Sequence, residues 1–215
     1  MRIIIVDDHG IVREGLKSLL QNQSDMEVVG EGQDGQVAVE LAEQLSPDMV
    51  IMDMSMPNLN GIEATRLILQ NNPNIKVVIL SMHSDRHIVK ETLEAGASAY
   101  VLKSNLFDEM LRALETVAGG GRYLSPRITD VVIDDYVGKS AGDESAEVQK
   151  LTSRERQIVQ LVAEGKSIKE IARILHISPK TADSNRRQIM HKLGFSGVAE
   201  LTKYAIREGL TSLEF

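Results

Sequence analysis

The segment from Val50 to Gly61, VIMDMSMPNLNG, constrains the fold more than any other part of this chain. The apolar run from Met49 to Met52 has the length of a strand and is hydrophobic on both faces, which is typical of a buried parallel sheet. The run stops at Asp53, so we expect this carboxylate at the carboxyl end of the strand, where open α/β sheets bind ligands. A lone Asp after an apolar run is more often a loop or capping residue. The interpretation of Asp53 therefore depends on its companions.

Two further carboxylates follow another candidate strand. Residues 3–6 (IIIV) are apolar, and Asp7 and Asp8 come directly after them. Asp7 could cap the helix that the next apolar positions predict, but capping needs one carboxylate and not two. Three acids at one edge of a sheet would repel each other unless a cation neutralised them, and Mg²⁺ prefers oxygen ligands of this kind. We therefore expect a magnesium site formed by Asp7, Asp8 and Asp53.

Charge is divided unevenly along the 215 residues, which favours two domains over one. Residues 1–149 hold 12 basic and 24 acidic side chains, a net charge of −12, whereas residues 150–215 hold 12 and 7, a net charge of +5. The two halves should therefore face different partners. The chain has no cysteine, which excludes disulfides and thiolate sites, and no run approaches the roughly 18 apolar residues of a membrane span. With no signal peptide pattern at the amino terminus, we predict a cytoplasmic protein.

The first half alternates strand-like and helix-like stretches, which is typical of a parallel sheet covered by helices on both faces. We expect strands at residues 2–6, 26–30, 48–52, 75–80 and 99–102, and helices at residues 9–22, 34–45, 59–71, 85–95 and 106–118. The fourth strand leads to Ser81 and the fifth to Lys103, at the same edge as Asp53. Alone, the Ser would be a turn former and the Lys a solvated cation. Together with the three acids they predict a phosphoryl site.

The chemistry of such a site follows from its side chains. Asp7 and Asp8 would hold Mg²⁺, and Asp53 would attack phosphorus as a carboxylate nucleophile, forming an acyl phosphate. The metal and the Lys103 ammonium would offset charge on the phosphoryl oxygens, and the Ser81 hydroxyl would donate to one of them. The chain has no glycine-rich nucleotide cradle and no Lys-Ser/Thr pair of the P-loop kind. The phosphoryl donor should therefore be another molecule.

The order DD, then D with MPxxNG, then LS, then AYVLK resembles the receiver domain of bacterial two-component response regulators over residues 1–120. The resemblance implies a flavodoxin-like, five-stranded parallel sheet. It also implies a role for each site residue: a histidine kinase would phosphorylate Asp53, Mg²⁺ would bind Asp7, Asp8 and Asp53, the phosphoryl group would contact Ser81 and Lys103, and Tyr100 would be the switch aromatic. Ser104 follows the Lys where many receivers have Pro. A cis bond before a non-proline residue costs about 2.5 to 4 kcal/mol, so this loop is either strained or runs trans.

Residues 121–148 read as a linker with a short helix, which begins after Ser125 and ends near Val137. The stretch GKSAGDESAEVQ that follows has the composition of a flexible linker. Residues 149–215 are helical by their spacing. Two of these helices are joined by the short turn HIS, and Ser178 and Pro179 open the second one, whose outward face is polar and basic. This arrangement predicts a helix-turn-helix that binds DNA.

The second half resembles the carboxyl-terminal domain of NarL/FixJ regulators, also called LuxR-type, through LTxRE, KEIA, SPKT and KLG. Family recognition helices commonly read SxxTVxxH, whereas Ala182 and Asn185 stand here in place of the Val and the His. The resemblance implies that this helix contacts double-stranded DNA. Its candidate DNA-binding residues are Lys180, Thr181, Asp183, Ser184, Arg187 and Lys192.

The sequence thus predicts a response regulator and not an enzyme. Phosphorylation of Asp53 would control homodimerisation and sequence-specific DNA binding, and so transcription. We further expect the acidic and basic domains to contact each other at rest and to block both groove contact and pairing. Two alternatives stay open: a Mg²⁺-dependent phosphohydrolase with Asp53 as its transient nucleophile, and a regulator that binds DNA without phosphorylation. The hydrolase is disfavoured because no acid or base is placed to hasten hydrolysis.

Overall fold

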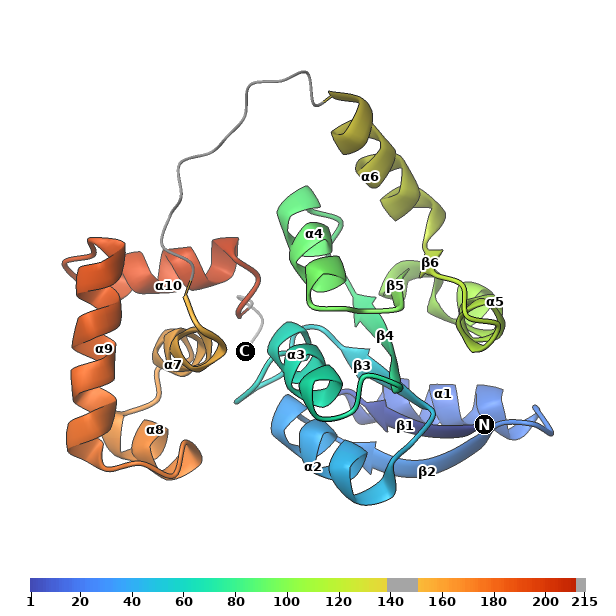
Figure 1. Cartoon of the computed structure of the whole chain (residues 1–215), viewed down its shortest axis with the longest axis horizontal. Coiled ribbons are helices and arrows are strands. Elements are labelled where there is room, and N and C mark those ends of the chain that lie inside the picture. Colours follow the sequence, from blue (N-terminus) through green and yellow to red (C-terminus); the bar gives the residue numbers. More distant parts are fainter. Residues whose placement is uncertain (139–150, 212–215) are drawn as a thin grey trace.

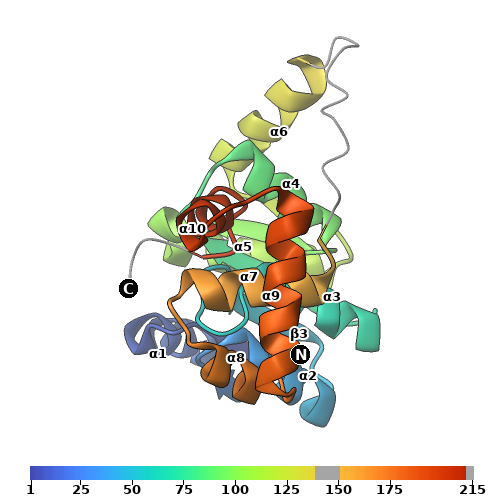
Figure 2. The same cartoon turned by 90° about the vertical axis from the view of Figure 1, so that its left-hand side faces the viewer.

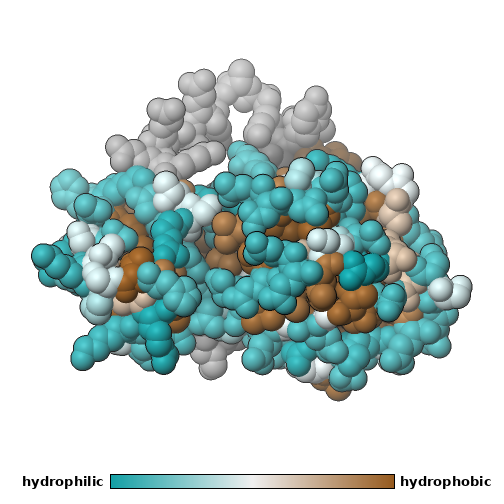
Figure 3. Space-filling view, turned by 60° about the horizontal axis from the view of Figure 1, so that its bottom comes forward, coloured by the Kyte–Doolittle hydropathy of each residue, from teal (hydrophilic) through white to brown (hydrophobic). Residues whose placement is uncertain are grey.

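The protein is described by a computed structural model, which places an amino-terminal α/β domain beside a carboxyl-terminal helical domain (Figure 1). The structure describes residues 1–138 and 151–211, with side chains up to residue 133 in the first range. Within these ranges, no helix has both the length and the apolar character that crossing a membrane would require. Figure 3 shows a face where hydrophilic side chains predominate, with apolar patches between them.

A six-stranded parallel sheet forms the centre of the amino-terminal domain, with strand order β2-β1-β3-β4-β5-β6. The strands are β1 (Arg2–Val6), β2 (Glu27–Gly32), β3 (Met49–Asp53), β4 (Lys76–Ser81), β5 (Ala99–Leu102) and β6 (Tyr123–Leu124). Every residue of β3 and β5 is buried, as the continuous apolar runs predict for a sheet covered on both faces. The five expected strands are confirmed. The sheet gains β6, which spans two residues and is too short to give a hydrophobic pattern.

Helices cover both faces of the sheet. Their bounds are α1 (Gly10–Gln21), α2 (Gly35–Leu45), α3 (Gly61–Asn71), α4 (Arg86–Glu94) and α5 (Leu106–Ala118). Successive side chains of β1 divide between two apolar cores, because neighbours in a strand point to opposite faces. Ile3 and Ile5 lie in the core with α1 and α5, whereas Ile4 and Val6 lie in the core with α2, α3 and α4. Because all six strands run parallel between these two helical layers, their carboxyl ends lie at one edge of the sheet.

The loop after β3 is held tightly against the strand that precedes it. The backbone N–H of Gly61 donates to the carbonyl of Met54 at 2.8 Å, and the Asn60 side chain caps α3 by accepting from the Glu63 N–H at 2.9 Å. A Cβ on Gly61 would lie only 2.3 Å from the Asp53 carbonyl oxygen, so no larger residue fits. The β3–α3 loop, residues 54–60, therefore starts at Asp53 and returns to it.

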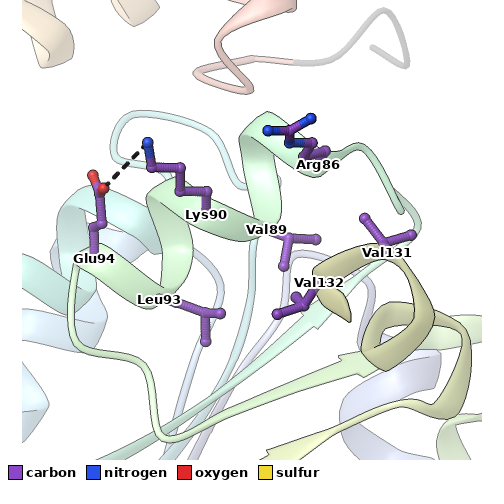
Figure 4. A pocket seen from close by; sticks show the side chains of 7 residues that line it. All are labelled: Arg86, Val89, Lys90, Leu93, Glu94, Val131 and Val132. Atoms are coloured by element: carbon purple, nitrogen blue, oxygen red, sulfur yellow. Dashed lines mark ion pairs between the residues drawn. The ribbon is translucent and has the colours of Figure 1, made fainter. Parts of the chain in front are cut away.

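Helix α6 (Pro126–Gly138) follows the sheet and packs beside α4. Between the two helices lies a groove of about 270 Å³ lined mainly by Val89, Leu93, Val131 and Val132 (Figure 4). Lys90 at its rim pairs with a Glu one turn later. The groove is apolar and so does not suit a phosphoryl group.

The helical domain consists of α7 (Ser153–Ala163), α8 (Ile168–Ile174), α9 (Pro179–Leu193) and α10 (Val198–Arg207). Its helix starts follow the sequence signals. Thr152 and Glu155 form the expected capping box, and Ser178 caps α9 with Pro179 at the first helical position. Helices α8 and α9 form the helix-turn-helix, and Ala182 at 0% exposure packs in the core between them and α7.

Candidate phosphoacceptor site and DNA-binding helix

The four strand ends bring the predicted site residues together. Asp7 follows β1, Asp53 ends β3, Ser81 ends β4 and Lys103 follows β5. The Lys103 Nζ atom lies 2.8 Å from Asp7 Oδ2 and 2.8 Å from Asp53 Oδ1. Asp7, Asp53 and Ser81 are buried, whereas Asp8 is exposed at the rim. The arrangement is a buried pair of carboxylates bridged by an ammonium and open to solvent on the Asp8 side.

The acids form a cluster that could hold a metal ion. Asp7, Asp8, His9 and Asp53 each offer one ligand atom within 4.8 Å of the others. Three of the four are carboxylates, and this oxygen set suits a hard cation such as Mg²⁺. His9 suits it less: its Nδ1 lies 2.8 Å from Asp8 Oδ1, and its backbone N–H donates to Asp7 Oδ1 at 2.9 Å. In the sequence, nothing marks His9 beyond its place after two acids.

Burial sets the protonation chemistry of Asp53. Removal from water raises the pKa of this carboxyl to about 6, with the negative Asp7 and Asp8 adding to the rise and the Lys103 ammonium opposing it. Burial alone would lower the pKa of Lys103, but Asp53 and Asp7 raise it overall. The ammonium is therefore charged at neutral pH. A cation in the acid cluster would oppose the rise at Asp53 in the same way, since it also favours the carboxylate.

Ser81 and Tyr100 are tied together through the backbone of His83. The Tyr100 hydroxyl donates to the His83 carbonyl at 2.9 Å, and the His83 N–H donates to Ser81 Oγ at 2.9 Å. The Met54 sulfur lies 3.5 Å from Ser81 Oγ and 3.9 Å from the Tyr100 hydroxyl oxygen. Burial raises the pKa of Tyr100 to about 12, so the phenol stays neutral. A movement of Ser81 toward Asp53 would disturb all these contacts.

The loop that carries Lys103 adopts a simple geometry despite Ser104. Residues Lys103–Asn105 form a single 3₁₀ turn, η1, that leads into α5. No cis peptide bond occurs in the described parts of the chain, so the bond before Ser104 is trans. The departure from the common Pro therefore does not prevent Lys103 from reaching Asp7 and Asp53.

The β3–α3 loop also carries the main contact with the helical domain. Gln160 of α7 is fully buried, and its carbonyl oxygen accepts from Asn60 N at 3.0 Å and Asn60 Nδ2 at 3.2 Å. Its amide nitrogen donates to the Met56 carbonyl at 2.9 Å and to Glu164 Oε1 at 2.8 Å. Glu164 in turn accepts from the Asn58 N–H at 3.5 Å. Both ends of the loop after Asp53 are thus bonded to α7.

An ion pair and two further polar contacts extend this contact. Arg156 of α7 pairs with the fully buried Glu63 of α3, and His87 Nε2 of α4 lies 2.7 Å from Glu208 Oε2 beyond α10. The Leu210 carbonyl accepts from Asn60 Nδ2 at 3.3 Å. These residues were not among those predicted from the sequence to have a function. A signal existed, because residues 156, 160 and 164 place three long polar side chains on one face of a helix.

The expected contact between the domains is present, but it does not cover α9. Helix α9 lies on the side of the helical domain that faces away from the sheet (Figures 1 and 2). Of its candidate DNA-binding residues, Lys180, Thr181, Ser184 and Arg187 are exposed. The prediction that closure blocks groove contact is therefore wrong for this arrangement. The reason is that α7 and the end of α10, and not α9, form the contact.

Four candidates on α9 have partners within the domain. Thr181 closes the amino-terminal cap, with its N–H 3.1 Å from Ser178 Oγ. Asp183 pairs with both Arg186 and Arg187. Lys192 lies at the other end of the helix, and its Nζ is 2.9 Å from Glu155 Oε2 of α7. Lys192 is thus engaged in an ion pair between two helices, whereas Lys180 near the start of α9 is exposed.

The fold and these two sites define a class: a phosphoacceptor-type α/β domain joined to a helix-turn-helix domain. Comparisons with known families agree with it. Residues 3–115 match the response regulator receiver domain, and residues 149–205 match the bacterial regulatory proteins of the luxR family. The chain is 36% identical to the transcriptional regulatory protein DegU of Brevibacillus brevis, covering 97% of this chain and 94% of that one. It is 33% identical to the response regulator UvrY of Escherichia coli, covering 100% and 97%.

Solved structures give the same result. RcsB of Salmonella enterica serovar Typhimurium, bound to promoter DNA in the presence of the phosphomimetic BeF₃⁻, is 27% identical, with a TM-score of 0.61 over 98% of this chain and 99% of RcsB. A LuxR-family response regulator from an Aurantimonas species is 39% identical, with a TM-score of 0.61, covering 63% of this chain and 97% of that one. The chain belongs to the two-component response regulators with a LuxR-type DNA-binding domain, which are transcription regulators and not enzymes.

Proposed function

We propose that Asp53 is the phosphoacceptor of this regulator and that a sensor histidine kinase is the donor. The observation that carries the proposal is the Lys103 ammonium, held between Asp7 and Asp53 at the edge where Ser81 also arrives. A carboxylate attacking phosphorus needs positive charge near the oxygens that gain negative charge, and the ammonium supplies it. Ser81 lies at the adjoining strand end, where its hydroxyl would donate to the phosphoryl group.

Mg²⁺ is the cofactor that the donor set fits best. Asp7, Asp8 and Asp53 would hold it, since their oxygens lie close together and carboxylates suit this ion. When bound, the ion would neutralise charge on the transferred phosphoryl group. The protein's own part is to keep Asp7 and Asp53 buried and to orient them through Lys103.

Tyr100 would report the state of the site as its switch residue. It shares the His83 backbone with Ser81, so recruitment of Ser81 to a phosphoryl group would also release the Tyr100 hydroxyl. The His83 segment leads directly into α4, whose His87 contacts Glu208 in the helical domain. This connection supports a route from Asp53 to the domain contact.

We further propose that α9 binds double-stranded DNA through Lys180, Thr181, Asp183, Ser184, Arg187 and Lys192, and that phosphorylation favours a homodimer. Recognition helices enter the major groove with their amino-terminal residues toward the bases, and two copies bind half-sites about one helical turn apart. Because α9 is accessible in the closed arrangement, the contact between the domains would restrain the pairing of two copies and not access to α9. A protein that receives a phosphoryl group from a kinase and binds DNA would work in the cytoplasm, so we propose that location.

The boundaries that accompany this function are residues 1–120 for the receiver domain, 121–148 for the linker with α6, and 149–215 for the DNA-binding domain. The families matched at residues 3–115 and 149–205 support them.

The decisive experiment is phosphorylation by acetyl phosphate with Mg²⁺, followed by intact mass. The wild type should gain one phosphoryl group, Asp53→Asn should gain none, and removal of Mg²⁺ should prevent the gain. Asp25→Asn, the same change at an exposed Asp, serves as the control and should behave as the wild type. Uptake by Asp53→Asn at the wild-type rate would show that the phosphoacceptor is misassigned. Sustained phosphate release over many turnovers would instead favour a phosphohydrolase.

A further inference from the structure

Helix α9 carries one acidic side chain in a place where acids weaken DNA binding. Between Pro179 and Leu193, Asp183 is the sole carboxylate among four Lys and Arg side chains. DNA phosphates repel a carboxylate, so an acid on a groove-facing helix lowers affinity for every sequence alike. We therefore expect Asp183 to have a function that offsets this loss of affinity for DNA.

The side-chain geometry points to that role. Asp183 Oδ1 lies 2.9 Å from Arg186 Nη2, and its other oxygen, Oδ2, pairs with Arg187 Nη2. These two guanidinium groups, that of Arg186 first, hold the pKa of the Asp183 carboxyl below its usual range. The Arg187 side chain is 74% exposed, whereas those of Asp183 and Arg186 are each 27% exposed. The Asp183 carboxylate thus holds the exposed Arg187 side chain through an ion pair on the surface of α9.

The spacing decides where Arg187 points. Residues four apart in a helix are neighbours, and a pair with residue 183 draws the guanidinium of residue 187 back toward the amino-terminal turns of α9. Those turns meet the base edges when a recognition helix docks. Without Asp183, the same flexible side chain would turn to the closest phosphate. The pair therefore favours the bases over the backbone as the target of Arg187.

The guanidinium keeps donors for a base while it is paired. Arginine has five N–H donors in a fixed fork, and Asp183 engages it through Nη2. The remaining donors can meet the O6 and N7 acceptors of guanine, the commonest specific arginine contact in the major groove.

We propose that Asp183 is a positioning residue that holds Arg187 for guanine recognition and penalises binding of α9 to DNA without that guanine. The inference rests on the proposed function, in which α9 is the DNA-binding helix. Asp183 acts through Arg187, so its removal should change specificity more than affinity.

The test compares a preferred duplex with a scrambled duplex of equal composition. Full-length wild-type protein, treated with acetyl phosphate and Mg²⁺, first selects the preferred duplex from a randomised pool. Dissociation constants for both duplexes are then measured against salt for the wild type, Asp183→Asn, Arg187→Ala, the double variant of these two positions, and Lys180→Ala. Glu200→Gln on α10 is the charge-matched control, because Gln can keep the capping role that Glu200 fills for Ser196 and Gly197.

For Asp183→Asn we expect tighter binding to the scrambled duplex, by about threefold to tenfold, and a salt slope steeper by about one, because Arg187 gains a phosphate contact. The ratio of preferred to scrambled affinity should fall by about tenfold, the scale of one bidentate base contact. The double variant should show the same ratio as Arg187→Ala. Glu200→Gln should leave the ratio unchanged.

Other outcomes overturn the inference. An unchanged ratio in Asp183→Asn together with a lowered ratio in Arg187→Ala would refute the positioning role and leave α9 as the DNA-binding helix. An equal fall in Asp183→Asn and Glu200→Gln would assign the effect to net charge alone. If Lys180→Ala and Arg187→Ala both bound the two duplexes as the wild type does, the proposed function of α9 would fail and the inference with it.

Discussion

Replacing Gln160 by Leu should open the contact between the two domains without phosphorylation. Gln160 makes three hydrogen bonds across that contact, two with Asn60 and one with the Met56 carbonyl. Leu has a similar volume but no polar atoms, so the closed form loses these bonds and leaves buried partners unpaired. In the open form water satisfies the same partners. The change therefore acts on the closed form selectively.

The size of the effect follows from the bonds. Each contributes a net of about 0.5 to 1.5 kcal/mol, so three together contribute about 1.5 to 4.5 kcal/mol. With a tenfold change for each 1.4 kcal/mol, the ratio of open to closed molecules should rise by about 10-fold to 1,000-fold. Two of the remaining contacts are the salt bridge of Arg156 with Glu63, a carboxylate that Arg66 would still share, and the exposed pair of His87 with Glu208. The other two are long hydrogen bonds, from Asn60 Nδ2 to the Leu210 carbonyl at 3.3 Å and from the Asn58 N–H to Glu164 at 3.5 Å. These contacts should not restore closure.

The natural absence of cysteine gives a specific assay. Dyes on Glu43→Cys and Lys203→Cys, both at exposed positions, report the distance between the domains by energy transfer. Unphosphorylated Gln160→Leu should show the longer distance that the wild type reaches only after acetyl phosphate and Mg²⁺. Gln36→Leu, the same change at an exposed site on α2, should keep the wild-type distance. An identical distance distribution in Gln160→Leu and wild type, with normal helix content, would refute the reasoning.

Three other predictions concern the site and its support. Without Mg²⁺, Asp53→Asn should stabilise the protein. The pKa of Asp53 in the folded protein, near 6, exceeds its usual 3.8, so this carboxyl lowers the wild-type free energy of unfolding as pH rises from about 4 to 6. The free energy of unfolding of the variant should therefore exceed that of the wild type by near zero at about pH 4 and by at most about 3 kcal/mol above pH 7. Urea unfolding at several pH values checks it, and a difference that shrank as pH rose would contradict it. Gly61→Ala should be strongly destabilising, because its Cβ would lie 2.3 Å from the Asp53 carbonyl oxygen, and should slow phosphorylation; wild-type melting and phosphorylation would show that the loop relaxes freely. Asp8→Ala should weaken Mg²⁺ binding, measured by titration calorimetry, while an unchanged affinity would remove Asp8 from the metal site.

The sequence predicted the site edge well because topology leaves little choice there. In a parallel sheet every carboxyl end meets one edge, so Asp53, Ser81 and Lys103 could be placed together from strand ends alone. β6 was missed because two residues carry no periodicity. The role of Gln160 in the contact between the domains was missed for another reason. In a sequence, a polar residue that is buried against a partner cannot be distinguished from a surface residue until that partner is known.

The expectation that contact between the domains would cover the DNA-binding helix was wrong. Opposite net charges predict attraction between two domains but not which faces meet. The choice is made by specific partners, such as Asn60 for Gln160 and Glu63 for Arg156, which lie 100 and 93 residues apart in the chain. Because Gln160 and Arg156 both lie on α7, the contact between the domains leaves α9 exposed.

The β3–α3 loop would couple phosphorylation of Asp53 to the position of the helical domain. A single short segment follows Asp53 and carries the bonds from Met56 and Asn60 to α7. Suppose that phosphorylation raises the equilibrium constant for separation of the two domains by some factor. By thermodynamic linkage, a ligand that binds only the separated form must then favour the phosphorylated protein by up to the same factor. Promoter DNA would then act as an effector of its own regulator: copies gathered on the right sequence would hold their phosphoryl groups in preference to copies free in solution.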